Sequence, residues 1–336
     1  MPEAHRISNG EKTLIAVIDS GIDSTHPEIA GTITESFDAI GGGNGEKAIP
    51  GNSADGIIHG TEVAGIIASH AALTGVAPQA HLLAVRAFAK GGDRTAVLGT
   101  TYDILAGLEW AVKHKAQVVN MSFAGPPDPD LSRELAEGSR RSVIFIAAVG
   151  NEGKAAKSSY PAAYENVIPV TATDRADAIF KDSSPCSTMC VAAPGVDIFA
   201  AAPAGAYKYD SGTSMAAAQV SGGVALLLDA KPGLDPKAVR DLLVKTAKHL
   251  SPADPGFAIR AGLLSSRHGE SRFGRFGNPL RFCLFGTRSS RSPSHEASEN
   301  DHGRRIAPYI SRVRFHVPES RAGGRRARKQ TYAGVE

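Results

Sequence analysis

The amino-acid sequence predicts an α/β domain of three layers, doubly wound, with a mainly parallel sheet. Short apolar segments alternate with longer segments of helical period over residues 13–248. The apolar segments are nearly continuous in Val, Ile, Leu and Ala, which is typical of parallel strands covered on both faces. Strands and helices that alternate in this way place the sheet between two helical layers. Functional sites of such sheets collect beyond the carboxyl ends of the strands.

Five segments predict strands, because they are short, apolar and bounded by polar or glycine-containing sequence. They are residues 13–18, 82–88, 117–122, 143–149 and 167–171. The segment 41–56 is rich in glycine and lacks an apolar period, so it predicts a loop.

Five further segments predict helices, and two of them carry clear local signals. In 235–248, Asp235 is placed to cap the helix and Pro236 occupies its first turn. In 214–229, apolar residues recur at helical spacing and form one apolar face. The five segments are residues 60–70, 95–115, 131–140, 214–229 and 235–248.

The composition changes near residue 260. Residues 261–336 contain 14 Arg and one Lys against six acidic residues, whereas the rest of the chain is net acidic. Serine and glycine are frequent there, and no amphipathic segment of helix length appears, which is typical of disordered chain. We expect a folded domain over residues 1–258 and an Arg/Ser-rich tail over residues 259–336 that is not a folded domain. A genuine tail and a change of reading frame are both open as explanations.

The cysteines and the N-terminus give no sign of export. Three cysteines are too few for a disulfide framework, and the spacing of Cys186 and Cys190 fits zinc poorly, so ordinary thiols are expected. The first twelve residues lack the apolar core of a signal peptide, and no apolar segment is long enough to cross a membrane. The sequence therefore does not identify the cellular compartment of the protein.

Three residues are candidates for joint chemistry, although each has a commoner structural role on its own. Asp19 ends the first predicted strand, where aspartate often serves a turn. His59 stands beside a glycine at a helix start, where a solvated surface histidine is the simpler explanation. Ser214 opens the helix 214–229, and serine is among the commonest capping residues.

Taken together, the order Asp, His, Ser is that of one class of triad hydrolases. The sequences around the three residues are IAVIDSGIDSTHPEI, HGTEVAGIIAS and GTSMAAAQVSGG. They resemble the corresponding segments of the subtilase family of serine peptidases. AAVGNEG (147–153), NMSFAG (120–125), YPAAYENVIPVTATD (160–174) and VAAPGVDI (191–198) also resemble family segments. The resemblance covers residues 13–248.

The resemblance implies a subtilisin-like fold and a serine endopeptidase of peptidase family S8 that forms a covalent acyl-enzyme. Ser214 would attack the peptide carbonyl, and His59 would take its proton and pass it to the leaving amine. Asp19 would fix the histidine tautomer without becoming protonated.

Further site residues follow from the same resemblance. Asn151 would donate its side-chain amide to the oxyanion. The substrate would pair as an added strand with the segment of Ser122, Phe123, Ala124 and Gly125.

The serine segment departs from the family pattern, which usually has Pro-His where this chain has Ala218 and Gln219. Alanine restores a backbone N–H and raises helix propensity, so we expect altered packing behind the nucleophile with the triad intact. The alternative to an active endopeptidase is a weakly active or inactive subtilase fold that serves as a binding or scaffold module.

The predicted partner is a protein or peptide substrate in extended conformation, and the chain is expected to be a monomer. The chemistry needs no cofactor and the sequence predicts no metal site, although structural calcium is common in subtilases. The loop 41–56 offers Glu46 and Asp55, but their spacing identifies no ligands. The basic run 322–330 lacks interleaved aromatic residues, so neither specific nucleic-acid binding nor membrane binding is expected.

Overall fold

The computed structural model describes residues 2–40, 57–90, 97–187, 190–250, 259–261 and 331–334. The chain divides into two compact units, one formed by residues 1–284 together with 329–336 and the other by residues 285–328. All the described residues belong to the first unit, and the fold below is that of this unit.

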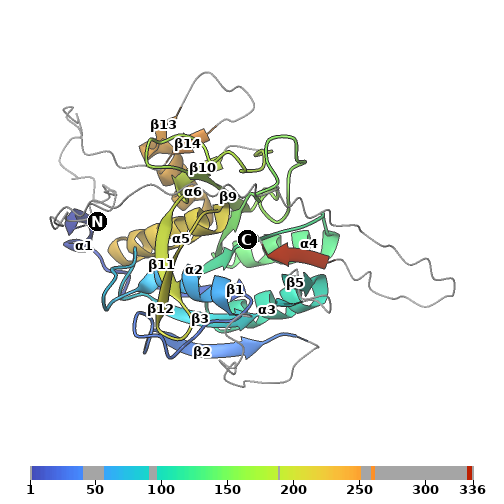
Figure 1. Cartoon of the computed structure of the whole chain (residues 1–336). Coiled ribbons are helices and arrows are strands. Elements are labelled where there is room, and N and C mark those ends of the chain that lie inside the picture. Colours follow the sequence, from blue (N-terminus) through green and yellow to red (C-terminus); the bar gives the residue numbers. More distant parts are fainter. Residues whose placement is uncertain are drawn as a thin grey trace, which may run out of the picture. The chain divides into compact units, whose positions relative to one another are not determined.

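A nine-stranded sheet forms the centre of the unit (Figure 1). Its strands run in the order β13-β14-β10-β9-β8-β6-β1-β3-β2. Neighbouring strands of this sheet pair in parallel, except that β13 pairs antiparallel with β14. The strands are β1 (Leu14–Asp19), β2 (Ile33–Asp38), β3 (His81–Arg86), β6 (Val118–Met121), β8 (Ile144–Ala148), β9 (Val167–Thr173), β10 (Cys190–Pro194), β13 (Lys248–His249) and β14 (Ile259–Ala261).

The interior strand β1 shows why the strand sequences are apolar throughout. It lies between β3 and β6, with Ile15 opposite Leu82 on one side and Val118 on the other. Its side chains alternate between two buried clusters: Ile15 and Val17 face one, and Ala16 and Ile18 face the other. Because both faces of the strand are buried, every position favours an apolar residue.

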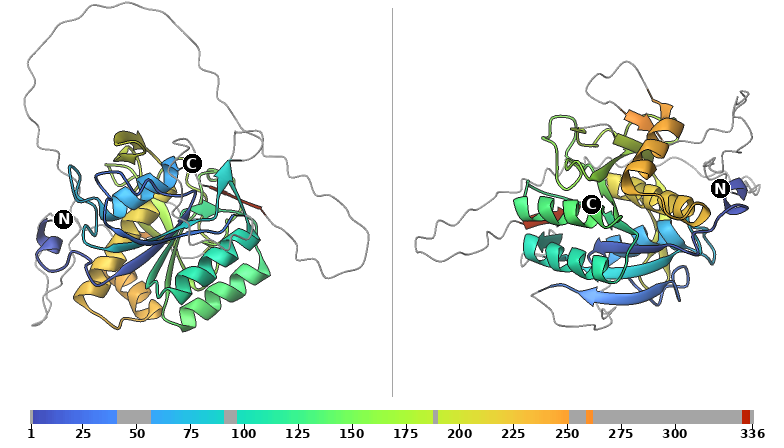
Figure 2. Two further views of the ribbon diagram at one scale, coloured as in Figure 1. Left: turned by 90° about the horizontal axis from the view of Figure 1, so that it is seen from below. Right: turned by 180° about the vertical axis from the view of Figure 1, so that it is seen from behind.

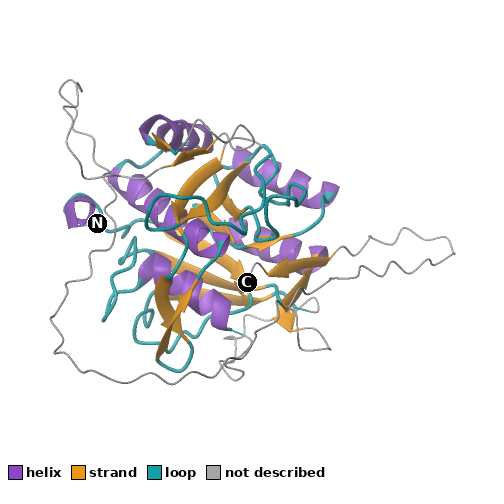
Figure 3. Ribbon diagram, turned by 45° about the horizontal axis from the view of Figure 1, so that its top comes forward, coloured by secondary structure: helices purple, strands orange, loops and turns teal. Residues whose placement is uncertain are grey.

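Helices cover both faces of the sheet (Figure 3). On one face lie α2 (Ile58–Ala68), α5 (Thr213–Ala230) and α6 (Pro236–Thr246), whose apolar residues share one buried cluster. On the other face lie α3 (Thr101–Lys113) and α4 (Pro129–Arg140), which run side by side (Figure 2). A short helix α1 (Pro2–His5) precedes β1. None of the helices in the described ranges is long and apolar enough to cross a membrane.

The predicted three-layer α/β architecture is confirmed, and all ten predicted elements are present. Asp235 caps α6 by accepting a hydrogen bond from the N–H of Ala238 at 2.7 Å. Helix α5 runs without a break through Ala218 and Gln219. The helix predicted from residue 95 begins at Thr101 instead, because Thr100 and Asp103 form a capping box there.

Two smaller sheets were not predicted. One is the hairpin of β11 (Ile198–Ala202) and β12 (Ala206–Asp210). The other has the order β4-β5-β15-β7, with β4 (Ala89–Lys90), β5 (Val97–Thr100), β7 (Phe123–Ala124) and β15 (Thr331–Gly334). Strands β14 and β15 lie within the predicted tail, residues 259–336, but they pair with strands of the domain. The domain boundary at residue 258 is still a prediction.

The structure joins Cys186 and Cys190 in a disulfide, so the expectation of ordinary thiols is wrong for these two residues. Their Cα atoms lie 6.2 Å apart, within the usual range for a disulfide. Cys186 lies in the loop before β10 and Cys190 is its first residue, and the loop between β9 and β10 brings their Cα atoms together. Cys283 lies outside the described residues.

Candidate active site

The carboxylate of Asp19 lies at the carboxyl end of β1 and is buried. It accepts hydrogen bonds from the N–H of Ser20 at 2.7 Å and from its hydroxyl at 3.2 Å. Both carboxylate oxygens lie 2.9 Å from Nδ1 of His59. The carboxyl end of β1 thus directs the side chain of Asp19 toward His59 in the first turn of α2.

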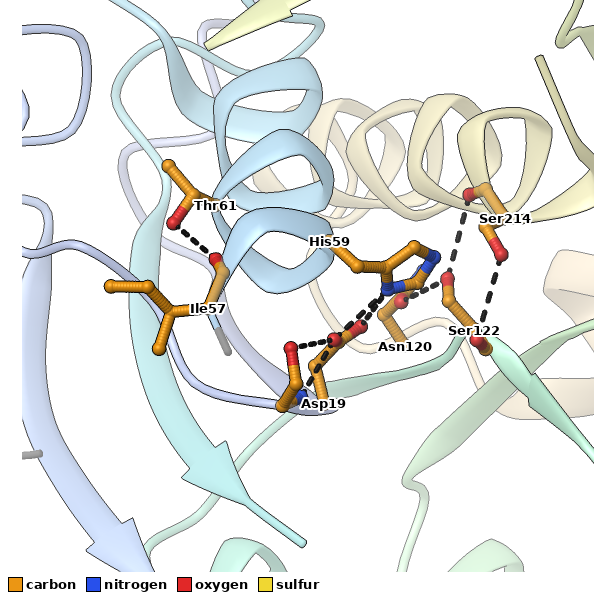
Figure 4. Close-up of polar contacts among 8 residues, drawn as sticks. Asp19, Ile57, His59, Thr61, Asn120, Ser122 and Ser214 are labelled. Atoms are coloured by element: carbon orange, nitrogen blue, oxygen red, sulfur yellow. Dashed lines mark hydrogen bonds and ion pairs between the residues drawn. The ribbon is translucent and has the colours of Figure 1, made fainter. Parts of the chain in front are cut away.

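His59 stands in the first turn of α2, and Gly60 lets this turn approach the end of β1. A Cβ atom at Gly60 would lie 2.1 Å from the carbonyl oxygen of Gly21, so only glycine fits there. An ionised carboxylate only accepts hydrogen bonds, so Nδ1 of His59 carries the proton that faces Asp19. Figure 4 shows the ring between Asp19 and Ser214, with its second nitrogen on the side of the serine. The neutral imidazole therefore presents Nε2 as a base on that side.

Ser214 occupies the second position of α5, and the helix cap is Gly212. Because the N-cap position is taken by Gly212, Ser214 lies inside the first turn of the helix and not at its cap. Its Oγ lies 3.5 Å from the carbonyl oxygen of Ser122, and the hydroxyl of Ser122 donates in turn to the carbonyl of Ser214 at 3.4 Å. The N-terminal N–H groups of α5 and the helix dipole favour negative charge beside this hydroxyl.

Asn151 follows β8 and is oriented by the residue before Ser214. Its side-chain oxygen accepts hydrogen bonds from the N–H of Thr213 at 3.0 Å and from its hydroxyl at 2.9 Å. The preceding Gly150 adopts a φ of 100°, where glycine is favoured, and donates to the same hydroxyl at 3.2 Å. These bonds fix the amide plane beside the start of α5, with the NH₂ group close to Gly212.

The four predicted substrate-binding residues form a short segment next to Ser214. Ser122 joins β6 to β7, and Phe123 and Ala124 make up β7. The backbone of Gly125 pairs with Tyr160, through bonds of 2.8 and 3.0 Å. The backbone of Phe123 and Ala124 pairs with strand β15.

A small pocket connects this segment with the catalytic candidates. Its lining includes Asp19 and His59 together with Val97 of β5 and Phe123 of β7. The full lining is Ile18, Asp19, Ser20, His59, Phe88, Val97, Ser122 and Phe123.

Glu62 is a buried charged residue that the sequence analysis missed. It lies one turn after His59 on α2 and is 1% exposed, and its carboxylate pairs with Nζ of Lys208 at 3.1 Å. Lys208 also pairs with Asp210 at 2.8 Å. Burial and the negative charge of Asp210 raise the pKa of Glu62 to about 7, against the opposing effect of Lys208 and His59. The signal available in the sequence was a glutamate within an otherwise apolar helix.

The described residues contain no group of three or more His, Cys, Asp or Glu side chains that would hold a metal ion. Glu46 and Asp55, the acidic residues considered for calcium, lie outside the described residues. The reaction proposed for this site involves no metal ion in any step.

Comparison with known proteins finds a matching family model and several similar proteins. A model described as the subtilase family matches residues 10–269. Subtilisin E of Bacillus subtilis (strain 168) is 36% identical over 248 residues, which cover 72% of this chain and 62% of the relative. Subtilisin of Bacillus pumilus is 36% identical over 248 residues and is covered over 86% of its length. Subtilisin Savinase of Lederbergia lenta is 36% identical over 256 residues, which cover 74% of this chain and 88% of the relative. The chain spans 62% of the length of the first relatives it matches.

Proposed function

The chain belongs to the subtilase family, and we propose that it is a serine endopeptidase that cleaves peptide bonds through Asp19, His59 and Ser214. The observation that carries the proposal is the contact of both Asp19 oxygens with Nδ1 of His59 at 2.9 Å, on the side of the ring away from Ser214. A histidine held in this tautomer serves as the base for a neighbouring hydroxyl.

The reaction begins when Oγ of Ser214 attacks the carbonyl carbon of the peptide. His59 accepts the hydroxyl proton on Nε2, and the carboxylate of Asp19 stabilises the imidazolium that forms. When the tetrahedral intermediate collapses, the C–N bond breaks and His59 returns the proton to the leaving amine. An ester of Ser214 remains. A water molecule then attacks this ester with His59 again as base, which releases the carboxylic acid and restores the serine.

The charge that develops on the carbonyl oxygen needs donors fixed in advance. The N–H groups at the start of α5 provide one source, because the first amides of a helix have no partner within it. The amide of Asn151 provides another, since Thr213 holds its oxygen and leaves the NH₂ group directed to the same region. One such donor is worth about 3–4 kcal/mol of transition-state stabilisation.

The substrate is a protein or peptide in extended conformation. Strand β7 begins directly after Ser122, whose carbonyl lies 3.5 Å from Oγ of Ser214. A peptide that adds to the edge of β7 would pass the nucleophile, and backbone pairing of this kind selects an extended chain more than a particular sequence.

The experiment is hydrolysis of casein and of a chromogenic peptide by the purified chain, before and after treatment with a serine-directed inhibitor. The wild-type chain should cleave both, the inhibitor should abolish cleavage, and Ser214→Ala should reduce kcat/KM by at least about 10⁴-fold. Ser132→Ala, on α4 and the opposite face of the sheet, is the matched control and should retain full activity. A folded wild-type chain that is no faster than Ser214→Ala would favour the scaffold alternative.

A further inference from the structure

The C-terminal strand β15 pairs with the edge of β7, to which substrate would bind in the proposed function. It pairs antiparallel with β5 on one side, where Tyr332 lies opposite Gly99. On its other side it pairs antiparallel with β7, where Ala333 lies opposite Ala124. In Figure 1, β15 is the red arrow beside β5. A segment more than 200 residues away in sequence thus fills the gap between two strands of the domain.

This gap leads to the proposed nucleophile. Ser122, the residue before β7, exchanges contacts of 3.4 and 3.5 Å with Ser214. Val97 of β5 and Phe123 of β7 line the same pocket as Asp19 and His59. A strand between β5 and β7 therefore lies along the approach to the site.

The side chain of Tyr332 is fully buried and anchors β15 in this gap. Its ring meets that of Phe123 edge-on, with the centroids 6.0 Å apart and the planes at 81°. A Cβ atom at Gly125 would lie 2.2 Å from Cδ1 of Tyr332, so glycine provides the room for the ring. Burial raises the pKa of the Tyr332 phenol, as do Tyr164 and Asp128. The aromatic ring fills a matching pocket rather than lying on the surface.

We propose that residues 331–334 are an intramolecular ligand of the substrate cleft and keep the peptidase inhibited until this strand is displaced. The proposal rests on the proposed function, since it assumes that substrate pairs with the same strand edges. A tethered segment competes at an effective concentration that reaches the millimolar range, above that of most added substrates. Only the fraction of molecules with β15 displaced then binds substrate, and kcat/KM is reduced to that fraction of its uninhibited value.

The first test removes the anchor in the full-length chain. Tyr332→Ala should raise kcat/KM for a short chromogenic peptide by about tenfold or more, because the strand loses its buried ring. Ala333→Pro weakens the backbone pairing of β15 instead, because proline has no N–H to donate at the position that faces both β5 and β7. The matched control is Tyr309→Ala, another tyrosine of the C-terminal region, which should leave kcat/KM unchanged. If Tyr332→Ala and Ala333→Pro both match the wild type, the proposal is overturned.

The second test supplies the strand as a separate peptide. A synthetic peptide of residues 329–336, KQTYAGVE, should inhibit the Tyr332→Ala chain competitively, and the same peptide with alanine in place of tyrosine should not. Equal inhibition by both peptides, or by neither, contradicts an anchor role for the tyrosine.

A binding measurement separates this proposal from the proposed function. The fluorescein-labelled peptide is titrated by anisotropy into full-length Ser214→Ala and into the Ser214→Ala/Tyr332→Ala chain, neither of which needs to be active. The double variant should bind the peptide at least about tenfold more tightly, because its cleft is open. Equal affinity overturns the inhibitory strand even when hydrolysis depends on Ser214. If the double variant binds the peptide more tightly as expected, but neither the wild-type chain nor Tyr332→Ala has activity, the peptidase proposal is overturned. The proposal that β15 occupies the cleft then still holds.

Discussion

Replacement of Glu28 by glutamine should destabilise the domain more than any other single change of one carboxylate to an amide that we consider. Glu28 is fully buried, and its side chain holds the loop that follows α2. One oxygen accepts from the N–H groups of Ala72 and Leu73 at 2.9 Å each and from the hydroxyl of Tyr207 at 2.7 Å. The other oxygen accepts from the N–H of Ala71 at 3.1 Å. The carboxylate therefore connects the end of the helix that carries His59 with strand β12.

The magnitude follows from these four bonds. A glutamine keeps one acceptor oxygen but presents its NH₂ group to the N–H of Ala71, so one charge-assisted bond is lost, worth about 1.5–3 kcal/mol. The bonds at the remaining oxygen also lose the contribution of the charge. We expect a loss of about 3 kcal/mol in the free energy of unfolding, which lowers Tm by about 6–12 °C in a domain of this size.

The pH dependence gives this prediction its sign. Burial alone would raise the pKa of Glu28, but the hydrogen bonds from Tyr207 and the three backbone N–H groups lower it below its ordinary value of 4.5. The stabilisation is therefore complete above pH 4.5 and is lost as the pH falls through the lowered pKa of the folded state. The difference between wild type and Glu28→Gln should be largest at pH 7 and should narrow below pH 4.5.

The assay is urea unfolding followed by circular dichroism at pH 7 and at pH 4. Glu11→Gln, which changes an exposed carboxylate near the N-terminus, is the control and should shift the free energy of unfolding by less than about 0.5 kcal/mol. A Glu28→Gln chain as stable as this control at pH 7 would refute the reasoning.

Three further predictions concern the proposed site. Asp19→Asn should lower kcat by about 10⁴-fold with the fold intact, because an amide no longer holds the proton on Nδ1 of His59, and steady-state kinetics with a loss below about tenfold would contradict this. Asn151→Ala should lower kcat by about 10²–10³-fold with little change in KM, and a change in KM alone would place the amide outside the oxyanion site. The pKa of Glu62 is raised from 4.5 to about 7, so Glu62 holds its proton more tightly in the folded state. As the pH rises from 4.5 to 7, the free energy of unfolding of the wild type should therefore fall by up to about 3 kcal/mol. Thermal unfolding curves of Glu62→Gln should show no such fall. If the stability of Glu62→Gln depends on pH as that of the wild type does, Lys208 compensates the charge.

Local sequence patterns predicted five strands of the main sheet, β1, β3, β6, β8 and β9, but not the interior strand β10. Strand β1 is apolar at every buried position because both faces are covered, and this leaves a continuous apolar run that reads as a parallel strand. Strand β2 was missed, since ITESFD lies at the sheet edge with only partly buried or exposed residues. The hairpin strand β12 (AYKYD) was missed for the same reason.

The candidate site was predictable where function leaves local sequence marks. Asp19, His59 and Ser214 each stand in a segment typical of the family, and the structure brings Asp19 and His59 into contact. The pairing of Lys208 with Glu62 had no local mark, because it joins positions 146 residues apart. Strand β15 was not predicted either, since its residues form a strand only between β5 and β7, which are distant in sequence.

The central claim is that the hydroxyl of Ser214 is a nucleophile made reactive by His59. The most direct measurement is intact-mass and peptide mapping of the full-length chain after reaction with a fluorophosphonate. We expect one adduct per chain, located on Ser214 among all the serines, and its formation should be at least about 10³-fold slower in His59→Ala. An adduct spread over several serines, or one on Ser214 that forms equally fast without His59, would contradict the account.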